Sequence, residues 1–155
     1  MFIEIERKFL VDKLPDCAKQ NSRKESIQQG YIILEADREL RIRRKGDNFF
    51  LTEKKGSGLC REETEIAVNE EVFNFFWPMT KGMQVKKVRY TFMFDTYQFE
   101  LDVYEGSLEP LLTLEVEFSS QQEAEAFVPP SFASLDVTND HRYKNASLAK
   151  KSHNE

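Results

Sequence analysis

Acidic and basic side chains recur at every second position in several segments, which gives the sequence its chemistry. Near the start, Glu4, Glu6 and Lys8 alternate with apolar residues, and Arg41 and Arg43 do the same further on. Carboxylates that gather in one place repel one another unless a cation joins them, and Mg²⁺ and Mn²⁺ favour such oxygen ligands. Arginine forks suit phosphate oxygens. This combination predicts a site for a metal ion and an oligophosphate.

The elements that must position these groups are strands, because a period of two is the signature of a β-strand. Short, turn-like connections such as Gly46-Asp47 and Asp95-Thr96 predict that neighbouring strands pair as antiparallel hairpins. The predicted strands are Phe2–Val11, Ser26–Ile33, Glu39–Lys45, Asn48–Lys55, Cys60–Ile66, Val85–Phe94, Tyr97–Tyr104 and Leu111–Phe118.

Helices are predicted between or after the strands. Asn69 is a candidate N-cap for an aromatic-rich helix that Pro78 should end, and Ser120 with Glu123 matches a capping box. A further helix is expected between Pro15 and Lys24, and a short terminal one that frays by Lys150. The fold class is therefore mostly β with a few covering helices (α+β), and residues 1–155 are expected to form a single domain.

Alternate side chains of a strand point to opposite faces, so each predicted strand can be divided into two columns. One combined face carries seven cations and eight anions. They are Lys8, Arg41, Arg43, Lys54, Arg61, Lys87 and Arg89, with Glu4, Glu6, Glu63, Glu65, Glu100, Asp102, Glu115 and Glu117. Such a face usually meets water. Here eight strands suffice to close a barrel, and the opposite face is rich in phenylalanine, so we place the charges inside.

Composition excludes several other classes of protein. The 155 residues include 22 Lys and Arg against 27 Asp and Glu, a net charge of −5 that disfavours nucleic-acid binding. Cys17 and Cys60 are too few for a disulfide framework, and the only histidines, His141 and His153, lie near the C-terminus. No apolar run approaches the roughly 20 residues of a membrane span, and the charged N-terminus is unlike a signal peptide. A cytoplasmic protein is expected.

Beginning at Glu4-Ile5-Glu6-Arg7-Lys8, the sequence resembles the CYTH superfamily, the triphosphate tunnel metalloenzymes. The ExExK run is followed in order by further charged segments that span nearly the whole chain. These are Arg41-Ile42-Arg43, Leu51-Thr52-Glu53-Lys54, Arg61-Glu62-Glu63-Thr64-Glu65, Lys87-Val88-Arg89-Tyr90, Glu100-Leu101-Asp102-Val103-Tyr104, Leu114-Glu115-Val116-Glu117-Phe118 and the stretch 137–145. The short chain is most similar to the compact bacterial inorganic triphosphatases.

The resemblance implies an eight-stranded antiparallel tunnel that hydrolyses tripolyphosphate to pyrophosphate and phosphate with Mg²⁺ or Mn²⁺. The metal ligands would be Glu4, Glu6, Glu115 and Glu117, with Asp102, Glu63 and Glu65 serving a second ion or the attacking water. The phosphates would bind Lys8, Arg41, Arg43, Lys54, Arg61, Lys87 and Arg89, and Tyr31 would assist Lys54.

Two other functions stay open at this point. A class IV adenylate cyclase would use a similar tunnel on ATP, although the sequence has no dedicated nucleoside motif. A non-catalytic polyphosphate or nucleotide sensor would bind without turnover. The aromatic segment Phe73–Trp77 is expected to cover the barrel, and any part of it left exposed would favour a homodimer.

Overall fold

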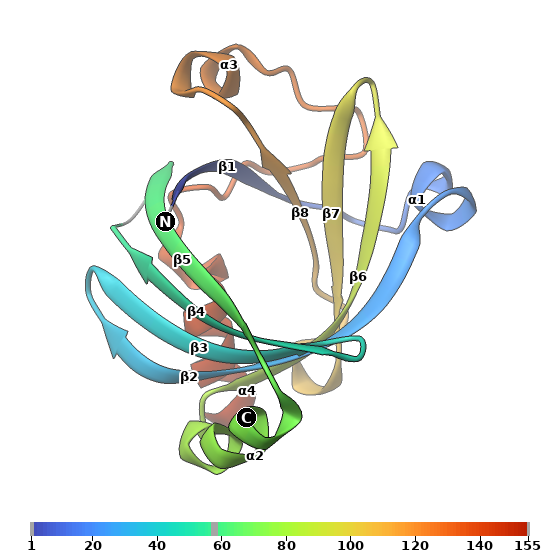
Figure 1. Cartoon of the computed structure of the whole chain (residues 1–155). Coiled ribbons are helices and arrows are strands. Elements are labelled where there is room, and N and C mark those ends of the chain that lie inside the picture. The colour runs from blue at the N-terminus through green and yellow to red at the C-terminus, as the bar shows by residue number, and fades with distance from the viewer. Residues whose placement is uncertain (1, 57–58, 155) are drawn as a thin grey trace.

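Eight antiparallel strands close into a barrel in the computed structural model, which describes residues 2–56 and 59–154 (Figure 1). Around the barrel the strand order is β1-β5-β4-β3-β2-β6-β7-β8. The strands are β1 (Phe2–Leu10), β2 (Arg23–Glu35), β3 (Arg38–Lys45), β4 (Asn48–Lys55), β5 (Cys60–Val68), β6 (Gln84–Phe94), β7 (Tyr97–Tyr104) and β8 (Leu112–Glu117). Closure confirms the predicted barrel and turns one whole face of the sheet inward.

The N-terminal strand closes the barrel by pairing with two partners. Its first half pairs with β5, with Glu4 opposite Arg61, and its second half pairs with β8, with Glu6 opposite Glu117 and Lys8 opposite Glu115. The β6–β7 hairpin turns at Asp95 and Thr96, whose φ angles of 49° and 70° suit the twist of a tight hairpin. These registers place the charged side chains of β1 directly beside those of its neighbours.

Four α-helices and three short 3₁₀ turns are found in the described part of the chain. They are α1 (Asp16–Gln20), α2 (Glu70–Phe76), η1 (Trp77–Thr80), η2 (Gly106–Leu108), α3 (Gln121–Ala126), η3 (His141–Tyr143) and α4 (Asn145–Asn154). The predicted caps are present, because Asn69 accepts from the amide of Val72 at 2.9 Å and Ser120 from that of Glu123 at 3.1 Å. None of these helices is long and apolar enough to cross a bilayer.

Two helix boundaries differ from the sequence-based expectation. Pro78 ends the α-helix as predicted, but the chain continues as η1 because proline is tolerated in a first helical turn. The terminal helix continues past Lys150 to Asn154. Leu148 and Ala149 are buried on this helix, and packing of these apolar residues favours a helix that its polar sequence alone would not predict.

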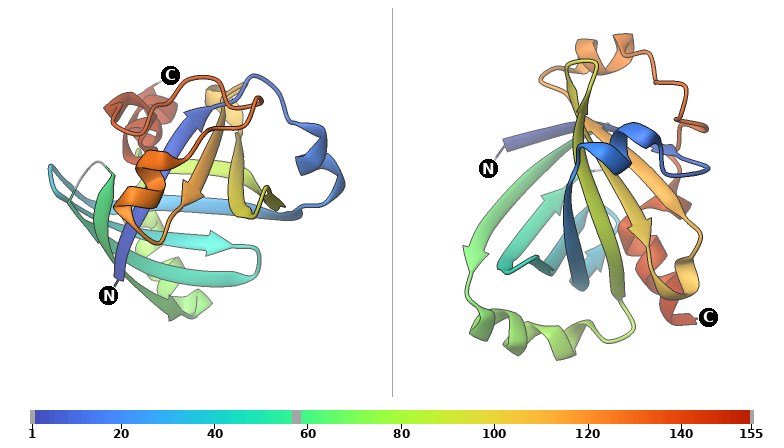
Figure 2. Two further views of the ribbon diagram at one scale, coloured as in Figure 1. Left: turned by 90° about the horizontal axis from the view of Figure 1, so that it is seen from above. Right: turned by 90° about the vertical axis from the view of Figure 1, so that its right-hand side faces the viewer.

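The apolar core lies outside the barrel wall and at one of its ends. Phe9, Phe99 and Leu114 belong to a cluster on the outer face of β1, β7 and β8, which α3 and the segment after it cover (Figure 2). A second cluster joins Tyr104 of β7 to Leu148 of α4. The charged interior is therefore held between a phenylalanine-rich cover and a C-terminal helix.

Candidate functional site

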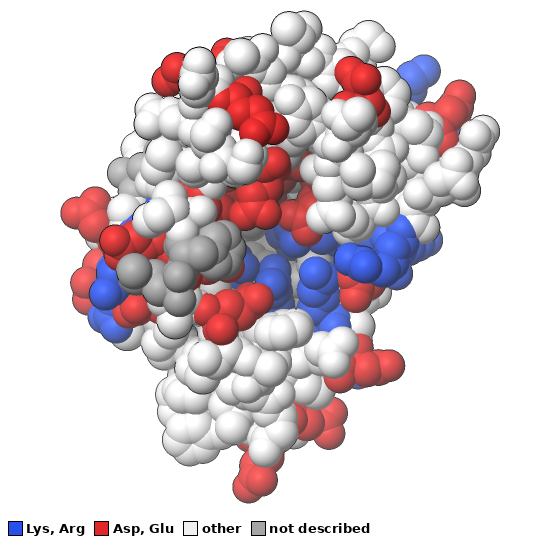
Figure 3. Space-filling view, turned by 45° about the horizontal axis from the view of Figure 1, so that its top comes forward, with Lys and Arg blue, Asp and Glu red and all other residues white. Residues whose placement is uncertain are grey.

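A cavity of about 250 Å³ occupies the barrel interior, and all eight strands contribute to its lining. Figure 3 shows the molecule hollowed here, with lysine and arginine side chains inside the hollow and acidic ones along its edge. Thirteen predicted site residues line it: Glu4, Glu6, Lys8, Tyr31, Arg41, Arg43, Lys54, Arg61, Glu63, Glu65, Arg89, Glu115 and Glu117. The alternation of the strands thus collects residues from distant parts of the sequence in one space.

Several lining residues had no predicted role. Glu39 and Lys45 share the inward face of β3 with Arg41 and Arg43, so the same alternation could have found them. The C-terminal stretch that contributes Thr138, Asp140, Tyr143, Lys144 and Asn145 has no strand periodicity that could assign it to the lining. Its position depends on how the end of the chain packs across the barrel.

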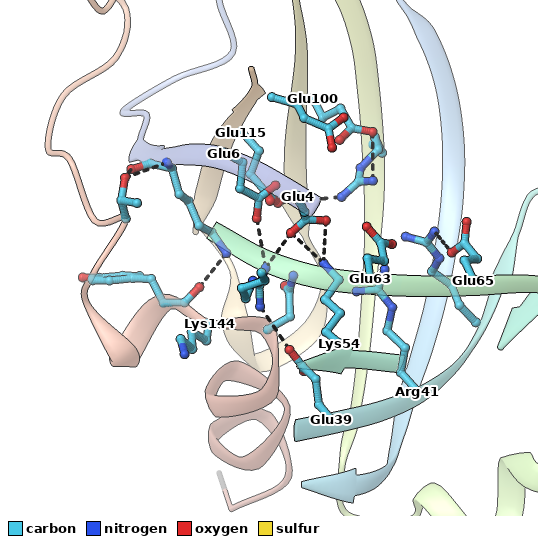
Figure 4. Close-up of a pocket in the computed structure, with 18 of the residues that line it drawn as sticks. Glu4, Glu6, Glu39, Arg41, Lys54, Glu63, Glu65, Glu100, Glu115 and Lys144 are labelled. Atoms are coloured by element: carbon cyan, nitrogen blue, oxygen red, sulfur yellow. Dashed lines mark hydrogen bonds and ion pairs between the residues drawn. The ribbon is translucent and has the colours of Figure 1, made fainter. Parts of the chain in front are cut away.

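The first of two ion networks surrounds Glu4 and Arg61. Glu4 accepts from Lys54 Nζ at 3.1 Å and from Arg61 Nη2 at 2.9 Å. Arg61 also reaches Glu6 and Glu39, each at 3.1 Å, so one guanidinium joins three carboxylates (Figure 4). Burial opposes ionisation of Glu4, but Lys54 and Arg61 outweigh it and lower the pKa of Glu4 below its usual range.

The second network surrounds Asp102, beneath the cavity floor. Arg89 binds Asp102 through two parallel hydrogen bonds of 2.8 and 3.0 Å, and Lys87 Nζ lies 2.6 Å from Asp102 Oδ2. Burial would raise the pKa of Asp102, yet Arg89 and Lys87 lower it. Asp102 and Lys87 are the two predicted site residues that do not line the cavity. They hold Arg89, which does.

Carboxylates lie close to one another on the β1 and β8 side of the cavity. Burial and the negative charges of Glu115 and Glu4 raise the pKa of Glu6 well above its ordinary value. Burial and a hydrogen bond with Glu4 likewise raise the pKa of Glu63 to about 7. Buried Glu115 Oε1 has no hydrogen-bond partner and lies 3.8 Å from Arg89 Nη2. Such crowding favours a proton or a metal cation between the carboxylates.

Some cations of the lining have capacity left for an anion. Arg41 makes no ion pair among the described residues, and the buried Nε atoms of Arg41 and Arg43 have no hydrogen-bond partner. Lys8 Nζ donates to the carbonyl oxygen of Tyr143 at 2.6 Å and forms no described ion pair. These donors are suited to an anion, because a buried donor without a partner costs free energy.

Tyr31 lines the cavity but contacts a different partner from the one expected. Its hydroxyl accepts from Gln29 Nε2 at 3.0 Å, whereas Lys54 is hydrogen bonded to Glu4. Burial and the negative charge of Glu39 raise the pKa of Tyr31, so this phenol is neutral. The predicted pairing of Tyr31 with Lys54 is absent from the described contacts.

The C-terminal segment fixes the position of Lys8. Thr138 Oγ1 accepts from the Lys8 amide at 3.0 Å, and the Val137 amide donates to the Lys8 carbonyl at 2.8 Å. At the start of α4, Asn145 Oδ1 accepts from the Tyr104 hydroxyl at 2.5 Å and lies 3.5 Å from Lys87 Nζ. One side of the cavity is therefore built by residues that follow the last strand.

Within residues 2–56 and 59–154, no group of three carboxylate, histidine or cysteine side chains is arranged as a ready set of metal ligands. The carboxylates point into the cavity but are engaged by cations or by one another. Binding of a metal would require Glu4 or Glu6 to exchange these partners.

Two curated relatives resemble the chain over nearly its full length. It is 45% identical over 148 residues to an inorganic triphosphatase of Nitrosomonas europaea, covering 94% of this chain and 96% of the relative. It is 33% identical over 152 residues to an inorganic triphosphatase of Acetivibrio thermocellus, covering 95% of this chain and 93% of that protein.

Solved structures and a family model agree with these relatives. The crystal structure of the inorganic triphosphatase NE1496 superimposes with a TM-score of 0.72 at 41% identity, covering 97% of this chain and 96% of the other. The model of the CYTH domain matches residues 3–152. With the charged interior of its closed barrel and a family match over almost every residue, the chain belongs to the CYTH domain family.

Proposed function

We propose that the protein hydrolyses inorganic tripolyphosphate to pyrophosphate and phosphate inside the barrel, with Mg²⁺ or Mn²⁺ as the cofactor. The observation that carries the proposal is the cavity lining, in which cations with free donors, such as Arg41 and Lys8, face clustered carboxylates such as Glu6 and Glu115. The two relatives named inorganic triphosphatase support the same reaction.

The acidic side of the cavity fits a hard divalent cation. Glu115 Oε1 is buried without a hydrogen-bond donor, and the pKa of Glu6 is raised by burial and by its acidic neighbours. Oxygen ligands of this kind suit Mg²⁺ and Mn²⁺. We assign the metal to Glu4, Glu6, Glu115 and Glu117. When bound, such an ion polarises a phosphate oxygen and lowers the pKa of a coordinated water.

The basic side of the cavity would bind the triphosphate. Arg41, Arg43 and Lys8 have donors available now, whereas Lys54 and Arg61 are held by Glu4. If Glu4 turns to a metal ion, Lys54 and Arg61 are released to the phosphates. The lumen would then exchange internal ion pairs for metal and substrate contacts without leaving a buried charge unpaired.

Hydrolysis would follow as in-line attack of water on a terminal phosphorus, with pyrophosphate as the leaving group. Arg41, Arg43 and Arg89 would neutralise the charge on the transferring and leaving groups. We assign orientation of the water to Glu63 and Glu65, the latter held by Thr52 at 2.7 Å and Arg43 at 3.1 Å.

The contacts of Asp102 and Lys87 support an indirect role for both residues. Asp102 is saturated by Arg89 and Lys87 below the cavity floor. We therefore propose that Asp102 and Lys87 hold Arg89 in place. Asp102 would then affect metal binding only by positioning Arg89 in the cavity lining.

A substrate panel tests the function. Tripolyphosphate, ATP, thiamine triphosphate and longer polyphosphate are each incubated with Mg²⁺, with Mn²⁺ and without metal, and phosphate and cyclic AMP are measured. The proposal expects preferential, metal-dependent phosphate release from tripolyphosphate. Cyclic AMP from ATP would favour the cyclase, and tight binding without turnover under every condition would favour the sensor.

We also propose a cytoplasmic location and a homodimer. Cys17 and Cys60 are free thiols, which suits a reducing compartment. Phe75 of α2 is 65% exposed and Met79 of η1 is 56% exposed, so apolar surface is available for a second copy. Light scattering of the purified chain tests the assembly, and a monomer at all concentrations would exclude the dimer.

A further inference from the structure

A second cavity, of about 300 Å³, lies next to the tunnel. It is formed by the β2–β3 hairpin, the end of β4 and the first turns of α4, and we refer to it as the outer pocket. Glu39, Lys54 and Lys144 line both cavities. Figure 4 shows Glu39 and Lys144 on the same side of the tunnel as α4. These three side chains therefore form the boundary between the tunnel and the outer pocket.

Positive charge prevails in the outer pocket. Arg38, Lys54, Lys144 and Lys150 line it together with His141, against the two carboxylates of Glu35 and Glu39. Arg38 is paired with Glu53 at 2.7 Å, but Lys144 and Lys150 form no ion pair among the described residues. Lys144 lines both cavities, and burial and the positive charge of Arg61 lower its pKa. The pocket is suited to an anion continuous with the one in the tunnel.

The rest of the lining argues against a nucleoside in this position. The apolar side chains are the aliphatic Leu34, Ala36 and Ala146, and no Phe, Tyr or Trp is among the described residues of the pocket. Apart from the imidazole of His141, a base would lack the aromatic platform on which bases usually stack. Lysines that bind phosphate as point charges need no such platform.

We propose that the outer pocket binds the phosphate groups of linear polyphosphates that extend beyond the three held in the tunnel. The inference rests on the proposed function for the placement of the first three phosphates. Chains of four or more phosphates then bind the protein more tightly than tripolyphosphate, whether or not they are turned over.

Calorimetry in the presence of a chelator tests the inference because it measures binding of tripolyphosphate and tetrapolyphosphate without turnover. Lys150→Glu should weaken the binding of tetrapolyphosphate by about fivefold or more, which is the effect of one charge at about 4 Å in water. The affinity for tripolyphosphate should stay unchanged. Lys151→Glu is the matched control. Lys151 is also exposed, follows in the same helix and is not among the pocket residues.

A steric variant provides a second test. Ser147→Trp should fill the outer pocket and selectively weaken the binding of tetrapolyphosphate. Circular dichroism establishes that the variant is folded. Equal affinity of the wild type for the two polyphosphates would overturn the inference, as would equal effects of the Lys150 and Lys151 variants. A Lys150 effect on ATP but not on tetrapolyphosphate would also overturn it. Failure of the proposed function is separate, because it appears as absent hydrolysis of tripolyphosphate with metal.

Discussion

The two ion networks of the barrel use the same kinds of side chain but differ in their access to solvent. Around Arg61, the side chains of Arg61, Glu6 and Glu39 are 14%, 16% and 19% exposed, although that of Glu4 is only 7% exposed. Around Asp102, the side chains of Asp102 and Lys87 are 1% and 0% exposed. Ions that water can reach can change partners at modest cost, whereas fully buried ions need their partners permanently. The first network is suited to binding and the second to support.

The largest effect is expected from a substitution that breaks the buried network around Asp102. Asp102→Ala leaves Lys87 and Arg89 buried without their main carboxylate, and should cost about 3–5 kcal/mol of folding free energy. Chemical denaturation measures the loss. Glu100→Ala is the control, because Glu100 pairs with Arg89 at 3.0 Å but its side chain is 30% exposed. Equal losses in the two variants would remove the distinction between the networks.

The next effect concerns activity in the network around Glu4 and Arg61. Glu4→Gln should lower metal-dependent hydrolysis about 100-fold or more, because it removes a proposed metal ligand, and Glu117→Gln should behave alike. Both variants should stay folded, as judged by circular dichroism and thermal unfolding. Glu62→Gln is the matched control, since Glu62 lies in β5 beside Glu63 and is not among the cavity residues. Full activity in Glu4→Gln would contradict the assignment.

If Glu4 exchanges its cation partners for a metal ion as proposed, the Glu4 variant that lowers hydrolysis should bind the substrate more tightly. Without metal, Glu4→Gln should bind tripolyphosphate about fivefold more tightly than the wild type, because Lys54 and Arg61 lose the carboxylate that holds them. Calorimetry with a chelator measures this. Weaker binding by the variant would show that these cations do not become available to the substrate.

The smallest effect is expected at Tyr31. Tyr31→Phe removes the acceptor of the Gln29 amide and should cost about 1 kcal/mol of stability, with less than about threefold change in hydrolysis. Steady-state kinetics and thermal unfolding provide the two readings. A loss of activity near that of Glu4→Gln would instead support the catalytic role that the sequence assigned to Tyr31 and Lys54.

Alternation was enough to predict the barrel and most of its lining. Asn48–Lys55 and Tyr97–Tyr104 have the predicted bounds, and the other strands differ at their ends by a few residues. Alternation succeeds because each closed strand has one inward face, so a residue's parity determines its environment. The same alternation places Glu39 and Lys45 on the inward face of β3 together with Arg41.

The depth of each side chain along the barrel could not be predicted in this way. Asp102 and Glu100 have the same parity, yet Glu100 lines the cavity and Asp102 lies beneath it. That difference depends on how far along the barrel each residue lies, which parity does not determine. The partners of Tyr31 and Lys54 likewise depend on registers between strands that are distant in sequence.

By itself, therefore, the sequence determined which side chains share the inward face of the sheet, because side-chain direction in a strand is a local property of the backbone. The tertiary structure decided which of these ions are exposed and exchangeable, which are permanently paired, and where the C-terminal segment adds Lys144 and Asn145 to the interior. Those properties depend on burial and on contacts across the closed barrel, which arise only when all eight strands and the terminal helix are in place.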